Sequence, residues 1–166
     1  VSSSHVEHPL SVKEEICAAV MNRIEEENIT DPLAVVRAAG DPMMPVCAGI
    51  AATYPGTLVY AGGTQMLAVA AVVKALGHLP PRLATTVYVR DDENATFEKT
   101  AREIGTTAWF VDPDFGNIGH PGLARYCAGE VKEGAGAGGA LWLASAMGHP
   151  KESIWEKIRE FMKDYS

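Results

Sequence analysis

The feature that most constrains the fold is an alternation of strand-like runs and helical segments between residues 57 and 111. The strand-like runs are short, apolar and partly β-branched, and the helical segments between them end at glycines. The predicted strands cover 57–61, 84–90 and 107–111, and the predicted helices between them cover 66–76 and 93–104. Because this alternation is typical of a parallel sheet with crossover helices, we expect a Rossmann-like α/β fold with three αβα layers and a mainly parallel sheet.

Further helices are predicted before and after this region. A capping-box pattern begins at Ser11, and Asp31-Pro32 and Asp41-Pro42 each place an N-cap residue before a proline at the first helical position. The helices predicted from these signals and from apolar spacing cover 11–27, 32–39, 42–52, a short segment ending near 128, 139–147 and 150–165. Since the sequence contains no tandem repeat and no low-complexity linker, we expect one α/β domain over residues 1–166.

Charge and hydropathy argue against two classes of protein, namely nucleic-acid-binding proteins and membrane-spanning proteins. The chain has a net charge of −7, and its 14 Lys and Arg residues are scattered, whereas nucleic-acid binding needs clustered basic residues. No apolar run reaches the ~18 residues that a membrane span requires. We therefore expect a soluble cytoplasmic protein with neither a nucleic acid nor a membrane as its partner.

The cysteines and histidines predict no metal site. Cys17, Cys47 and Cys127 lie among apolar or small neighbours without CxxC spacing, which favours buried free thiols in a reducing compartment. His5 and His8, followed by Cys17, match no zinc signature.

Two loops are candidates for ligand binding because each follows a predicted parallel strand. Open α/β sheets bind ligands beyond the carboxyl ends of their strands. The first loop contains Gly62, Gly63, Thr64 and Gln65 and leads into a helix, so it offers backbone N–H groups and a hydroxyl to an anion. It matches neither GxGxxG nor a P-loop, and a tight turn between strand and helix is an equal alternative.

The second loop begins at Asp112. An Asp-Pro pair is also typical of turns and helix caps, so this loop has a structural interpretation beside the functional one. The same holds for His120, which is either an acid or base or a turn residue before Pro-Gly.

A glycine run, KEGAGAGGA at 132–140, places one carboxylate before an apolar helical segment. Glycines allow a backbone to approach a ligand closely, so we expect the run to build a site rather than a core. Glu133 is the candidate general base, with Gly134 and Gly136 beside it as substrate contacts. The alternative is a flexible surface loop with a solvated glutamate.

Four blocks carry a resemblance to a known family. They are GDPMMPV at 40–46, AGGTQMLAVA at 61–70, HPGL at 120–123 and KEGAGAGGA at 132–140. In this order they resemble the nicotinate-nucleotide–dimethylbenzimidazole phosphoribosyltransferase family, in particular its archaeal and cyanobacterial branch. The likeness covers nearly the whole chain and corresponds to the C-terminal half of proteins about twice as long.

The resemblance implies a transferase. It implies phosphoribosyl transfer from nicotinate mononucleotide to a benzimidazole-type base, a step in making the lower ligand of cobamides, with Glu133 as general base and no cofactor. It places Gly62 and Gly63 at the family's glycine turn. The nucleotide-binding loop of the family lies further upstream, so we expect the isolated chain to be inactive. We also expect it to self-associate as a homo-oligomer, because an apolar surface left by the missing half would seek cover. The alternatives are a nucleotide-binding or regulatory module without transferase activity, and an enzyme of the same fold acting on another base.

Overall fold

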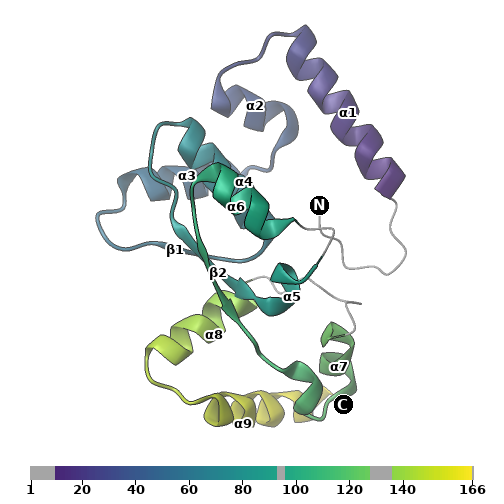
Figure 1. Cartoon of the computed structure of the whole chain (residues 1–166), viewed down its shortest axis with the longest axis vertical. Helices are drawn as coiled ribbons and strands as arrows, with labels where there is room; N and C mark the ends of the chain where they lie inside the picture. The colour runs from purple at the N-terminus through teal and green to yellow at the C-terminus, as the bar shows by residue number, and fades with distance from the viewer. Residues whose placement is uncertain (1–9, 93–95, 128–135, 166) are drawn as a thin grey trace.

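A computed structural model describes residues 10–92, 96–127 and 136–165, and its described strands form a three-stranded sheet in the order β1-β2-β3 (Figure 1). Both strand pairs are parallel, with Tyr60 opposite Leu83 and Ala84 opposite Trp109. The described elements are α1 (Leu10–Glu26), α2 (Pro32–Ala39), α3 (Met43–Thr53), β1 (Val59–Ala61), α4 (Thr64–Ala75), β2 (Arg82–Thr86), α5 (Val87–Arg90), α6 (Phe97–Ile104), β3 (Ala108–Val111), η1 (Phe115–Asn117), α7 (Pro121–Cys127), α8 (Ala137–Ala146), α9 (Lys151–Met162) and η2 (Lys163–Tyr165).

Helices cover both faces of the sheet, which confirms the predicted three-layer α/β fold. The crossover helices α4 and α6 bury Leu67, Val73 and Phe97 against the face that carries Leu83. On the same face the ring of Phe110 meets that of Phe97 edge to face, with centroids 5.7 Å apart. The opposite face is covered by α8, which extends over all three strands.

The helix α3 lies outside α4 and is tied to the first strand. The hydroxyl of Tyr60 in β1 donates a 2.9 Å hydrogen bond to the carbonyl oxygen of Cys47 in α3. Burial raises the pKa of Tyr60 to about 12, so the phenol keeps the proton of this bond beyond the pH at which an exposed tyrosine ionises. Ala48 of α3 is fully buried in the same core cluster.

Glycines allow α8 to lie very close to the sheet. A Cβ at Gly138 would be 2.3 Å from the carbonyl carbon of Thr85, and one at Gly139 would be 2.2 Å from the Cβ of Ala61. Both glycines are buried. The expectation that the glycine run builds a site rather than a core is therefore wrong for these two residues, because they approach the strands and not a ligand.

Beyond these glycines, aromatic side chains fill the space between α8 and β3. The indoles of Trp109 and Trp142 stack with centroids 4.6 Å apart, and the guanidinium of Arg82 lies 3.6 Å from the ring centroid of Trp109. The contact of α8 with the sheet thus uses glycines in its first turn and a tryptophan in its middle.

Several predicted boundaries differ from the structure, and three of them concern a strand end, a helix cap and a helix start. The second strand ends at Thr86, and residues 87–90 form the short helix α5 instead of continuing it, because pairing with β3 ends at the Thr86–Val111 pair. Ser11 lies inside α1 rather than at its N-cap, since the helix begins at Leu10. The helix predicted from residue 93 is described from Phe97, and residues 93–95 lie outside the described part.

The cysteines are free thiols, as predicted, but the expected burial is wrong for two of them. Cys17 and Cys127 are exposed, and Cys47 is half-buried. Cys17 lies on α1, which packs against α2 and leaves much of its apolar stripe in solvent. Cys17 and Cys127 are thus exposed to solvent although their neighbours in the sequence are apolar or small.

The N-cap of α2 offers a test of the local helix signals. Asp31 accepts a 2.8 Å hydrogen bond from the backbone N–H of Ala34, and Pro32 occupies the first turn, as predicted. We expect Asp31→Ala to lower the free energy of unfolding by about 1 kcal/mol because that N–H loses its partner, whereas Asp31→Asn should keep nearly all of it. Urea denaturation measures both variants, and equal losses would show that the cap oxygen contributes nothing.

Candidate functional site

The carboxyl ends of the three strands lie at one edge of the sheet, where the candidate site begins (Figure 1). Gly62 follows β1, Val87 follows β2 and Asp112 follows β3. Because both pairings are parallel, the Gly62-Gly63 turn and the Asp112 loop share this edge, as predicted from the order of the elements.

The turn after β1 needs glycine. Gly62 has φ of +151°, and a Cβ there would meet Cγ of Met66 at 2.8 Å, so a side chain would be both strained and crowded. Its N–H donates to the carbonyl oxygen of Ala84, which extends the β1–β2 ladder by one bond. The turn is thus held in place by the sheet, and the chain enters α4 immediately after it.

The first turn of α4 has no side-chain cap. The N–H groups of Met66 and Leu67 bond to the carbonyl oxygen of Gly63, whereas those of Thr64 and Gln65 precede the first intrahelical acceptor. The helix dipole adds partial positive charge at the same place. This end of α4 therefore offers two N–H donors and a hydroxyl, the chemistry expected for these residues.

A second helix begins beside the same turn. Gly136 is the N-cap of α8, and no side chain among the described residues caps this helix either. The position of a Cβ on Gly136 lies 3.6 Å from the Cβ of Ala61, the last residue of β1. Two uncapped helix N-termini, those of α4 and α8, thus converge on the end of β1, and two such dipoles directed at one place favour a bound anion.

Thr86, at the end of β2, lies at the same edge of the sheet although the sequence analysis did not select it. Its side chain is 2% exposed, and its hydroxyl oxygen has no hydrogen-bond partner within the described part of the chain. A Cβ on Gly138 would lie 2.7 Å from the backbone nitrogen of Thr86, so the first turn of α8 rests against it. A buried hydroxyl without a partner is costly and needs an explanation such as a ligand.

Thr86 would have been selected if the second strand had been predicted to end at residue 86. The predicted strand continued to residue 90, which moved its carboxyl end four residues too far along the chain. Because β2 ends at Thr86, the hydroxyl of Thr86 lies at the carboxyl end of its strand, as the Gly62 turn does on the neighbouring strand β1.

Asp112 lies where it was predicted but takes part in a turn. Its side chain is exposed, and Oδ1 accepts a 2.9 Å hydrogen bond from the N–H of Asp114. The loop is fixed further by α9, where the indole N–H of Trp155 donates to the carbonyl oxygen of Pro113 and Lys151 lies 3.6 Å from Asp114. The turn interpretation of Asp112 is therefore supported, and its carboxylate remains at the site edge.

An aromatic cluster closes the space between this loop and α5. Tyr88 packs against Phe115 and Tyr126, and its hydroxyl lies 3.0 Å from Sγ of Cys127. Burial, and then the bond with Cys127, raise the pKa of Tyr88. His120 is a turn residue, since its Nδ1 accepts a 3.1 Å hydrogen bond from the N–H of Gly122.

The candidate base is not placed. Glu133 and Gly134 lie outside the described residues, so their positions relative to the site remain predictions. Of the glycine run, the structure places Gly136 at the site and Gly138 and Gly139 against the sheet.

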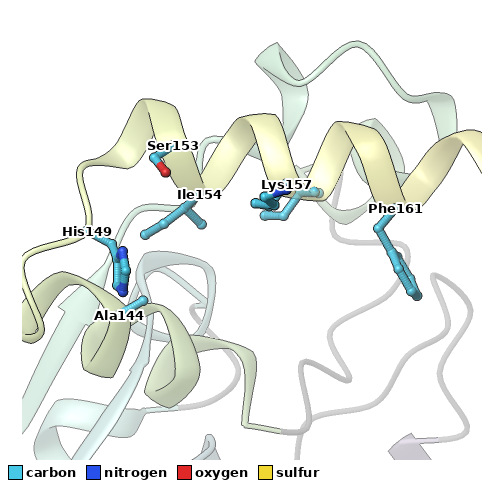
Figure 2. A pocket seen from close by; sticks show the side chains of 7 residues that line it. Ala144, His149, Ser153, Ile154, Lys157 and Phe161 are labelled. Atoms are coloured by element: carbon cyan, nitrogen blue, oxygen red, sulfur yellow. The ribbon is translucent and has the colours of Figure 1, made fainter.

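A cavity of about 400 Å³ lies elsewhere, between the C-terminal half of α8 and helix α9 (Figure 2). Its lining is mostly apolar, and the amine of Lys157 is paired with Glu160 at 2.7 Å. The lining residues are Ala144, His149, Ser153, Ile154, Lys157, Ile158 and Phe161. The cavity contains no residue predicted for the site, so it is separate from the sheet edge.

Two negative findings apply to residues 10–92, 96–127 and 136–165. Within these ranges no three His, Cys, Asp or Glu side chains are grouped so that they could hold a metal ion. No helix in them has the length and apolar character needed to cross a membrane.

Comparison with known proteins shows long similarities. No family model matches the chain. It is 45% identical to the UPF0284 protein of Thermococcus gammatolerans, over 98% of this chain and 50% of that protein. It is 44% identical to one from Pyrococcus abyssi, over 96% and 49%, and 38% identical to one from Methanosarcina mazei, over 98% and 49%. The chain is thus similar over nearly all its length to UPF0284 proteins, and it spans about half the length of the relatives it matches.

Proposed function

We propose that this chain contributes the acceptor and phosphate sites of a phosphoribosyltransferase that uses nicotinate mononucleotide and a benzimidazole-type base. The observation that carries the proposal is the convergence of the uncapped N-termini of α4 and α8 on the end of β1. The N–H groups there suit the phosphate of a mononucleotide. The family resemblance supplies the reaction, and it assigns the general base to Glu133.

The reaction needs one proton acceptor and one anion site. A ring nitrogen of the base attacks the anomeric carbon of the ribose, the bond from that carbon to the nicotinate nitrogen breaks, and its electron pair neutralises the pyridinium ring. The attacking base then loses its other N–H proton, which Glu133 accepts. Gly63, Thr64, Gln65 and Gly136 hold the phosphate through backbone N–H groups and a hydroxyl. Gly62 contacts the substrate by shaping the turn, because its own N–H bonds to Ala84. Asp112 and Gly134 contact the substrates as well.

The test uses a form of the relatives' full length that contains this chain. Incubation with nicotinate mononucleotide and 5,6-dimethylbenzimidazole should release nicotinate and form the α-riboside phosphate in equal amounts, as followed by chromatography. Tight binding of the mononucleotide without either product would instead favour a nucleotide-binding or regulatory module. If the protein neither binds the mononucleotide nor turns it over, both functions are contradicted.

Thr86 offers a separate test of the anion site. We expect Thr86→Val to raise the Kd for nicotinate mononucleotide about 10-fold or more, because a hydrogen bond to a charged phosphate contributes about 1.5–3 kcal/mol. Thr86→Ser keeps the hydroxyl and should retain most of the affinity. Without ligand, Thr86→Val should be as stable as the parent, since its unpaired hydroxyl is gone. An unchanged Kd, measured by calorimetry, would remove Thr86 from the site.

The proposal places the protein in the cytoplasm, where mononucleotides are made, and as a homo-oligomer. Light scattering of the full-length form measures the second point, and a strictly monomeric mass would contradict it.

A further inference from the structure

The outer edge of β1 has backbone groups that no neighbouring strand uses within the described residues. Because the N–H of Gly62 bonds to Ala84, the alternate residues Val59 and Ala61 direct their N–H and C=O groups away from β2. The N–H groups of both residues therefore face the outer side of β1, and the described strands place no partner on that side. An open edge of this kind pairs readily with another strand.

An exposed apolar stripe lies on α3, the helix that leads into β1 (Figure 1). The residues of the stripe are three, four and four positions apart, so their side chains lie on one face of the helix. They are Met43, Val46, Ile50 and Tyr54, which are 37%, 62%, 48% and 54% exposed. The bond from Tyr60 to Cys47 ties this helix to β1, and Figure 1 shows α3 and β1 on the same side of the ribbon. The stripe itself is exposed, whereas Ala48 of the same helix is buried in the core.

The topology distinguishes this edge from the other one. The chain passes from β1 to β2 to β3 in one direction, and both crossover helices, α4 and α6, lie on one face. Doubly wound sheets combine two such sets of strands that run outward from the middle, with the ligand crevice between them. In this chain the middle position is the open side of β1, directly beside the Gly62-Gly63 turn.

The relatives have the length to supply a second set. Nearly all of this chain matches about 50% of the Thermococcus gammatolerans protein, so the unmatched part of that protein is about as long as the chain. We infer that a parallel strand from this unmatched half pairs with the open edge of β1 and that its neighbouring helix covers the α3 stripe. The site at Gly62 then lies in a crevice between the two halves.

A second copy of this chain fits the same surface less well. A two-fold axis beside β1 would pair the strand with its own copy in the antiparallel direction, whereas the whole sheet here is parallel. Each copy also carries a net charge of −7 over its whole surface, so two copies repel each other electrostatically. The unmatched half therefore remains the occupant with the better geometry.

Hydrogen exchange resolved by residue tests the strand pairing. The 166-residue chain is compared with a form that also carries the segment corresponding to the unmatched half. We expect the amides of Val59 and Ala61 to exchange about 10-fold or more slowly in the longer form, because they gain acceptors. Tyr60, which bonds toward β2, should be protected in both forms. Equal exchange of Val59 and Ala61 in the two forms would overturn the inference.

A substitution tests the stripe without using activity. Val46→Glu in the longer form should lower Tm and increase the exchange of Val59 and Ala61, without changing the molecular mass. Leu79→Glu is the matched control, because Leu79 is 87% exposed in the loop between α4 and β2 and outside the stripe. If Val46→Glu instead halves the mass measured by light scattering, the occupant is a second copy and the inference is wrong. An effect no larger than that of Leu79→Glu would overturn it as well.

Discussion

Replacing Glu133 by glutamine in the full-length form is expected to lower kcat by about 10²-fold or more, because the amide cannot accept the proton that the attacking base loses. The side-chain volume is kept, so KM for nicotinate mononucleotide should change little. This pattern marks an interaction made chiefly in the transition state. Steady-state formation of the α-riboside phosphate, with 5,6-dimethylbenzimidazole as acceptor, measures it.

The control for this variant lies three residues upstream. Glu130→Gln removes the same charge from the same stretch of sequence but lies outside the KEGAGAGGA run. It should leave kcat nearly unchanged. If both variants lose activity equally, or if Glu133→Gln shifts the thermal melt while kcat stays intact, the catalytic assignment of Glu133 is wrong.

The second large effect is expected at the contact between α8 and the sheet. Gly138→Ala places a methyl group 2.3 Å from the carbonyl carbon and 2.4 Å from the Cα of Thr85, which are backbone atoms and cannot rotate away. The helix must move off the sheet, so we expect a loss of about 3 kcal/mol in the free energy of unfolding, at the upper end of typical overpacking costs. Urea denaturation measures it.

Gly49→Ala is the matched control for this loss. Gly49 is exposed within α3, and no atom lies within 4 Å of a Cβ placed on it. Alanine there should stabilise the helix by about 0.5–1 kcal/mol. Equal effects of Gly138→Ala and Gly49→Ala would mean that α8 does not pack against the strands at the observed distance.

The close contact also positions one side of the proposed anion site. The glycines that let α8 reach the strands bring its N-terminus to the end of β1, where Gly136 lies beside Ala61. A Gly138 variant that still folds should therefore also bind the mononucleotide less tightly, because the two helix N-termini no longer meet. The packing and the proposed anion site are thus coupled through one helix.

Local signals in the sequence determined the helices, the strands and their direction. Asp31 caps α2, the glycine turn at Gly62 ends β1, and strand-helix alternation predicts a parallel sheet, because each depends on residues a few positions apart. The shared edge of the Gly62 turn and the Asp112 loop followed from the same order. The assignment of Glu133 rests on resemblance and stays a prediction.

Tertiary structure alone decided where β2 ends, what the glycines touch and how far each cysteine is exposed. Residues 87–90 are β-branched enough for a strand, yet the chain turns into α5 after the last pair with β3, which depends on the length of a strand over twenty residues away. Gly138 and Gly139 suit either a ligand or a close helix, and only their position over Thr85 and Ala61 selects the helix. Burial depends on which surfaces meet across the fold, and spacing along the chain contains no such information.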